Sequence, residues 1–181
     1  MNYYRLRDDV DYPNRWHLGD ILDVNNWELL RAAPEIDRNL EMEIYQDGDE
    51  MDFTLSEVYG IPIVSRKIKQ ELECFPEVKF IPVFLERAGG GEYFAMVIQP
   101  AVECVDEEAS EFQKFEINDP VRPDKAGAYR AFMVLRLKVD SIGDVNIFRI
   151  KKFETAIIIS QRVRDKLESV GVTGMDLSLV A

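Results

Sequence analysis

Short runs of alternating hydrophobic and polar residues dominate the chain, and a period of two predicts β-strands. Such runs, or short β-branched ones, occupy residues 2–7, 41–45, 51–55, 61–64, 78–84, 93–98, 129–139, 145–150, 156–159 and 175–180. Helical spacing of hydrophobic residues appears only at 26–33 and in the segments that follow Ser65 and Ser160. We therefore expect an α+β fold of mostly antiparallel sheets with a few short helices.

Turn residues indicate how some of these strands connect. Asp47-Gly48 separates the runs 41–45 and 51–55, which predicts a β-hairpin with an acidic tip. Gly89, Gly90 and Gly91 form a second turn before the run 93–98. The polar segment 8–26 is expected to be a loop that Trp16 anchors in the core.

One pattern of eleven residues occurs twice. IVSRKIKQELE at 63–73 and IISQRVRDKLE at 158–168 align Ser65 with Ser160 and Leu72 with Leu167. In each copy an apolar run ends at a serine, which is a favoured helix N-cap, and hydrophobic residues follow at helical spacing. We interpret the copies as a pseudo-repeat of a strand–helix–strand unit. Chance use of a common capping pattern is the alternative.

The 181 residues suit a single domain over 1–181, with two lobes of about 1–100 and 101–181 around a shared core as the alternative. No segment is rich enough in Gly, Ser or Pro to separate independent domains. Apolar runs are too short to span a bilayer, and the first residues lack the apolar centre of a signal peptide. We expect a cytoplasmic protein without a membrane partner, in which Cys74 and Cys104 are free thiols.

Charge is unevenly distributed along the chain. The formal net charge is −12; residues 1–60 hold 5 basic and 15 acidic side chains, residues 61–120 hold 6 and 12, and residues 121–181 hold 11 and 7. A negative field repels nucleic acid and attracts a basic partner. Solubility alone is the other interpretation of this charge.

Motifs that bind metals or cofactors do not stand out. The chain has one histidine, His17, and no CxxC, so a zinc site is not supported. The three glycines at 89–91 lack a phosphate-binding pattern, and the acidic stretch 47–52 lacks the order of a calcium loop. We expect no cofactor and no metal.

A second group of acids offers the only enzymatic alternative. Asp106, Glu107, Glu108 and Glu111 lie close together in the sequence, and paired carboxylates can act as acid and base in a small hydrolase or transferase. That alternative requires the four groups to converge in a deep pocket with at least one perturbed pKa. A solvated acidic face is the simpler interpretation.

Over nearly its whole length the chain resembles a known family, the immunity proteins numbered family eleven of bacterial polymorphic toxin systems. The segments that carry the resemblance are YYRL at 3–6, W at 16 with G at 19, DF at 52–53, PIVS at 62–65, VKFIPV at 78–83, VECVD at 102–106 with S at 110, IFRI at 147–150, IIS at 158–160 and GVTGM at 171–175. The resemblance implies a non-enzymatic antidote that binds and neutralises a cognate toxin, often a nuclease. It implies no catalytic residues.

An antidote of this kind needs an interface, and the acidic N-terminal third suits a toxin with a basic, phosphate-binding surface. We expect the partner to contact two clusters, Asp8, Asp9 and Asp11 after the first strand, and Asp47, Asp49 and Glu50 at the hairpin tip. An acidic decoy that mimics nucleic acid is a further alternative. The next candidate interface is the basic helix with Arg162, Arg164 and Lys166. The sequence does not indicate whether the chain self-associates.

Overall fold

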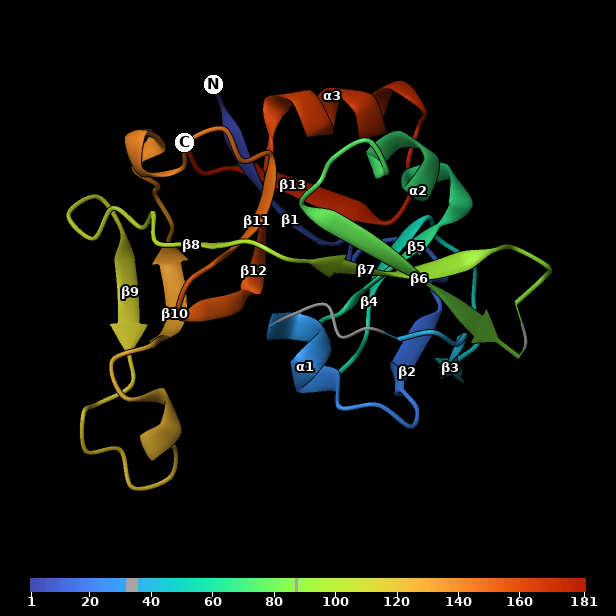
Figure 1. The fold of residues 1–181 in the computed structure, drawn as a ribbon, viewed down its shortest axis with the longest axis horizontal. Helices are drawn as coiled ribbons and strands as arrows, with labels where there is room; N and C mark the ends of the chain where they lie inside the picture. Colours follow the sequence, from blue (N-terminus) through green and yellow to red (C-terminus); the bar gives the residue numbers. More distant parts are fainter. Residues whose placement is uncertain (32–35, 87) are drawn as a thin grey trace.

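The computed structural model describes residues 1–31, 36–86 and 88–181. Within them the chain forms two mixed β-sheets, a two-stranded arm, three short α-helices and two 3₁₀ turns (Figure 1). Among the described strands, all pairs are antiparallel except β3–β6 and β8–β11. This arrangement confirms the predicted α+β class.

The first sheet has six strands in the order β2-β3-β6-β7-β5-β4. The strands are β2 (His17–Ile21), β3 (Leu40–Gln46), β4 (Phe53–Leu55), β5 (Pro62–Ser65), β6 (Val78–Leu85) and β7 (Tyr93–Ile98). Only β3 and β6 run parallel within this sheet. One face packs against Trp16 and against Leu29 and Leu30 of helix α1 (Asn26–Arg31), which form one core with Leu40 and Met42. The predicted helix at 26–33 is therefore confirmed, although its last two positions lie outside the described residues.

The second sheet has five strands in the order β13-β1-β12-β11-β8. The strands are β1 (Tyr3–Asp8), β8 (Ala101–Val102), β11 (Ile147–Ile150), β12 (Phe153–Ser160) and β13 (Met175–Leu179). Helices α2 (Arg66–Leu72) and α3 (Gln161–Ser169) lie side by side (Figure 1). Their buried residues Ile68, Leu72, Val163 and Leu167 share a core with residues of both sheets. The helical spacing of hydrophobic residues after each serine predicts that these four side chains face inward, and their burial confirms it.

A two-stranded arm stands beside the second sheet (Figure 1). It consists of β9 (Glu111–Lys114) and β10 (Tyr129–Val134), with the 3₁₀ turn η1 (Pro123–Lys125) in the loop between them. Phe132 of β10 makes an edge contact with Phe153 at the start of β12, which attaches the arm to the body. After β10 the chain enters the turn η2 (Val139–Ser141).

The two sheets contain the same topological unit. Strands β5 and β6, joined by α2, both pair antiparallel with β7, and strands β12 and β13, joined by α3, both pair antiparallel with β1. Ser65 aligns with Tyr93 of β7, and Ser160 aligns with Tyr3 of β1. Strands β4 and β11 flank the units in the same position. The pseudo-repeat is therefore structural, but β7 follows its unit in the chain whereas β1 precedes its own.

The two serines occupy equivalent networks, but only one caps its helix. The amide and hydroxyl of Ser65 donate to the carbonyl and Oδ1 of Asp52 at 2.8 and 2.7 Å. Those of Ser160 donate to the same two atoms of Asn146, both at 2.8 Å. Ser160 Oγ also accepts from the amide of Val163, which confirms that cap. The cap predicted at Ser65 is wrong, because its hydroxyl makes no bond to the helix and donates to the Asp52 carboxylate instead.

Three other local predictions were wrong. The segments 41–45 and 51–55 do not form a hairpin, because β3 pairs with β2 and β6 while β4 pairs with β5. The segment 8–26 is not all loop, since it contains β2, although Trp16 is buried as expected. The strand expected over 129–139 ends at Val134. The first error concerns pairing with a strand distant in sequence, since β6 lies about forty residues after β3.

Candidate partner-binding surface

The structure brings the two predicted acidic clusters to the same part of the molecule. Asp8 Oδ2 accepts from the guanidinium of Arg15 at 2.5 Å, and Asn14 Nδ2 donates to Asp49 Oδ1 at 3.2 Å. The amide of Asp49 donates to the carbonyl of Asn14, and Arg15 and Asp49 form an isolated parallel bridge. The segment 14–16 therefore lies between both clusters.

Several of these acids are committed to bonds inside the protein. The Asp8 side chain is only 15% exposed, and burial raises its pKa despite the opposing Arg15. Asp8 was expected after the first strand, but it is the last residue of β1 and is largely buried. The Glu50 carboxylate accepts from the amide of Gly89 and, at 2.9 Å, from the hydroxyl of Tyr93. Burial, followed by this hydrogen bond, raises the pKa of Tyr93. Glu50 thus fixes the turn between β6 and β7.

The remaining predicted acids are more open to solvent. Asp9 is half-buried, and its Oδ1 accepts from the amide of Asp11. Asp11, Asp47 and Asp49 are exposed. Of the six predicted residues, Glu50 is exposed as well, but its carboxylate is held by the bonds to Gly89 and Tyr93.

A neighbouring surface was missed in the sequence. Side chains of β3 alternate between the core and solvent, so Glu41, Glu43 and Tyr45 point away from the buried Leu40 and Met42. Glu41 is in register with Phe84 of the parallel strand β6, and the amide of Leu22 donates to the carbonyl of Glu41. A concave surface of about 720 Å³ results. We call it the β3 face and define it by Leu22, Glu41, Glu43, Tyr45, Phe84 and Glu86.

The β3 face combines exposed aromatic rings with unpaired acids. Tyr45 is 72% exposed and Phe84 is 59% exposed. Among the described residues, no side chain forms a hydrogen bond or ion pair with Glu41, Glu43 or Glu86. The alternation in LEMEIYQ had indicated which side chains point outward. It could not show that β6 lies alongside and places Phe84 beside them, because that pairing is non-local.

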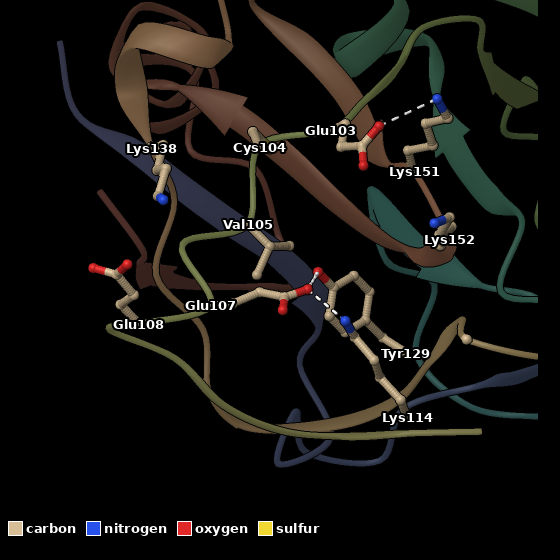
Figure 2. A pocket seen from close by; sticks show the side chains of 11 residues that line it. Glu103, Cys104, Val105, Glu107, Glu108, Lys114, Tyr129, Lys138, Lys151 and Lys152 are labelled. Carbon is tan, nitrogen blue, oxygen red and sulfur yellow. Dashed lines mark hydrogen bonds and ion pairs between the residues drawn. The ribbon is translucent and has the colours of Figure 1, made fainter. Parts of the chain in front are cut away.

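The carboxylates of the enzymatic alternative line a different pocket. A cavity of about 430 Å³ lies between the arm and the second sheet, and Figure 2 shows the side chains around it. Glu107 Oε1 accepts from Lys114 Nζ and from the Tyr129 hydroxyl, both at 2.6 Å. Glu108 points away from Glu107 (Figure 2), and Glu111 does not line the cavity. The four acids do not converge.

The ionisation of the groups in this pocket also suits structure better than acid–base chemistry. The hydrogen bond from Lys114, followed by that from Tyr129, lowers the pKa of Glu107, which favours a permanent carboxylate. Burial raises the pKa of the Cys104 thiol to about 12, so this cysteine is a poor nucleophile. Asp106 accepts from the amides of Glu108 and Ala109 and thereby orders its own loop. The arrangement does not support the hydrolase or transferase hypothesis.

Neither a cluster of metal ligands nor a membrane-spanning helix occurs in residues 1–31, 36–86 and 88–181. Within these ranges no three His, Cys, Asp or Glu side chains are placed to hold a metal ion together. His17 begins β2 and aligns with Gln46 of β3. In the same ranges, no helix combines the length and the apolar composition needed to span a bilayer.

Two comparisons with known proteins bear on this surface. A model of the immunity protein family Imm11 matches residues 31–181, which include β3, the β3 face from Glu41 onward and both copies of the repeated unit. A search among curated proteins found no match.

Proposed function

Since the chain belongs to the immunity protein family Imm11, we propose that it protects the cell that makes it by binding and neutralising one cognate toxin of a polymorphic toxin system. The family match over residues 31–181 carries this proposal. Binding is stoichiometric and non-enzymatic, and it takes place in the cytoplasm, where the toxin would act.

In such an interface, charged groups and apolar groups make different contributions to binding. A toxin that is a nuclease has a basic surface for phosphate, and the exposed carboxylates of Asp11, Asp47 and Asp49 complement it. Exposed charges of this kind mainly accelerate encounter. Protection requires tight binding, and a picomolar dissociation constant corresponds to ~16 kcal/mol. Apolar anchors supply most of that energy.

Co-expression provides the direct test. Cells that carry the toxin gene encoded beside this one should survive when the chain is produced and should die with an empty vector. Purified toxin should bind the chain at a ratio of one to one. Equal death with and without the chain would refute neutralisation.

The acidic surface is tested by association kinetics. Asp11→Asn with Asp47→Asn and Asp49→Asn should slow association severalfold at low salt. In ~0.5 M salt, where the Debye length is ~4 Å, the variant and the parent should converge. The matched control changes three exposed acids elsewhere, Glu116→Gln, Asp140→Asn and Asp165→Asn. Glu50 is left unchanged because of its bonds to Gly89 and Tyr93. Equal slowing in both triple variants would show that net charge alone matters.

A further inference from the structure

We propose that the β3 face is where the cognate toxin docks, with Tyr45 and Phe84 as anchors for a basic segment of that toxin. This inference rests on the function proposed above and goes beyond the acidic clusters. The occupant is a protein surface that presents lysine or arginine side chains, because the face offers both apolar rings and carboxylates.

The β3 face lacks the helical cover that the neighbouring strands have on the same side of the sheet. Along β6 the side chains of Ile81, Val83 and Leu85 point into one core, so Pro82 and Phe84 lie on the opposite side. On that opposite side α2 covers Met96 of β7 and Val64 of β5. The helix does not reach β3, and Tyr45 and Phe84 remain 72% and 59% exposed. Two large aromatic side chains so exposed on regular strands are typical of interaction surfaces.

The negative charge of the β3 face favours a basic partner. Glu41, Glu43 and Glu86 lie among these rings, and within the described part of the chain no side chain bonds to their carboxylates. Asp8, Asp49 and Glu50, by contrast, already accept hydrogen bonds from Arg15, Asn14 and Tyr93. Unpaired carboxylates complement a cationic partner without the loss of any internal bond. The six residues that define the face include no lysine or arginine.

On the β3 face an acidic side chain lies beside an aromatic ring. Glu41 and Phe84 are aligned across the β3–β6 pair. A guanidinium or ammonium group placed there can contact the ring face and a carboxylate together, which combines a cation–π contact with an ion pair. Arginine in particular can stack on an aromatic ring while its N–H groups donate to a carboxylate.

The backbone of the β3 face is held rigidly by its neighbouring strands. Backbone hydrogen bonds fix β3 between β2 and β6. The aromatic anchors therefore need little ordering when a partner binds. Preorganisation of this kind reduces the entropic cost of association.

The arm presents a contrasting apolar surface. Ile117 and Met133 are 82% and 59% exposed, but residues 111–134 hold four acidic and four basic side chains, so this segment has no net charge. A basic partner would gain little electrostatic attraction there. The arm thus supplies a matched control, because its exposed apolar side chains can be truncated in the same way.

The experiment compares two double variants of the full chain against the toxin domain encoded by the adjacent gene, inactivated by mutation. Tyr45→Ser with Phe84→Ser should raise Kd at least ~30-fold, the level expected when a residue set includes a hot spot. Most of the change should be in the dissociation rate. Ile117→Ser with Met133→Ser should change Kd by less than ~3-fold. Thermal unfolding of both variants should match the parent, since all four side chains are exposed.

The outcomes separate this inference from the proposed function. If the parent binds and protects but the Tyr45/Phe84 variant binds equally well, the β3 face is not the docking site. If the arm variant loses binding instead, the interface is on the arm. If the parent itself neither binds nor protects, the proposed function fails and this inference with it. Equal binding of cytochrome c, an unrelated basic protein, would show an unselective cation-binding surface and overturn the assignment to a dedicated toxin.

Discussion

Asp52 joins the two sheets, and its replacement should destabilise the whole protein. Its Oδ1 accepts from the Ser65 hydroxyl at 2.7 Å. Its Oδ2 accepts from Lys67 Nζ at 2.7 Å and from the amide and hydroxyl of Thr173 at 3.0 and 3.1 Å. Ser65 and Lys67 flank the start of α2, whereas Thr173 lies between α3 and β13. One carboxylate thus links the first repeated unit to the second.

The magnitude follows from these contacts. The Asp52 side chain is 13% exposed, so little water replaces the lost bonds, whereas Lys67 is 43% exposed and contributes less. A hydrogen bond to a charged group contributes about 1.5–3 kcal/mol. Three such bonds from Ser65 and Thr173, offset by the cost of burying the charge, suggest a net loss of ~3 kcal/mol for Asp52→Ala. At ~2–4 °C per kcal/mol for a chain of this size, Tm should fall by roughly 6–12 °C.

Urea denaturation followed by tryptophan fluorescence provides the assay. Trp16 is buried and donates from Nε1 to Thr54 Oγ1 at 2.8 Å, so its environment reports on the first sheet. The control is Asp176→Asn, because the Arg7–Asp176 pair has side chains 49% and 45% exposed and should contribute less than ~1 kcal/mol. A loss below ~1 kcal/mol for Asp52→Ala at unchanged m-value would refute the reasoning.

The same carboxylate predicts a dependence on pH. Burial acts to raise the pKa of Asp52, but the hydrogen bonds from Lys67, Ser65 and Thr173 together outweigh it, and the pKa lies below its ordinary value of 3.8. The stabilisation is therefore fully present above the ordinary pKa and is lost as the pH falls through the lowered pKa. The Asp52→Ala variant should lack this part of the acid dependence. An identical acid profile in both proteins would contradict the assignment.

Two further predictions use the serines and the cysteines. Ser65→Ala should lower the free energy of unfolding by ~1.5 kcal/mol in the parent but by less than ~0.5 kcal/mol in the Asp52→Ala background, because Ser65 acts through Asp52. Ser160→Ala should lower it by ~1 kcal/mol in both backgrounds. Urea denaturation of these four variants measures the coupling, and equal losses for Ser65→Ala in both backgrounds would contradict it. Iodoacetamide at about pH 8 should label the exposed Cys74 and leave the buried Cys104, whose pKa is raised to about 12, until the protein unfolds; mass spectrometry that finds two labels on the folded chain would contradict the burial of Cys104.

Local patterns predicted the elements that depend on local physics. The apolar spacing of Val163 and Leu167 gave α3, and the alternation in LEMEIYQ gave β3. The choice of strand partners was not local. Asp47-Gly48 was interpreted as a hairpin turn, yet β3 instead pairs with β6, about forty residues later in the chain. Turn residues indicate only whether strands adjacent in sequence can form a hairpin, so they could not predict this pairing.

The candidate surface shows the same division. Sequence located the acidic third of the chain, but it could not distinguish committed acids from unpaired ones. Asp8 and Glu41 look alike as residues, and only the fold shows that Arg15 binds the first while the second faces solvent. The sequence also missed Phe84, because its exposure depends on where α2 ends its cover of the sheet.

The displaced position of β1 sets the order of events during synthesis. Strands β4 to β7 are contiguous in the chain, so their unit can assemble while later residues are still being made. Strand β1 leaves the ribosome before the other strands, yet its partners β12 and β13 lie about 150 residues or more later in the chain. At about 5–20 residues per second, Tyr3, Tyr4 and Leu6 wait on the order of ten seconds for their neighbours. A nascent chain paused before β12 therefore exposes three hydrophobic side chains that the finished protein buries, and chaperone demand should be highest at that stage.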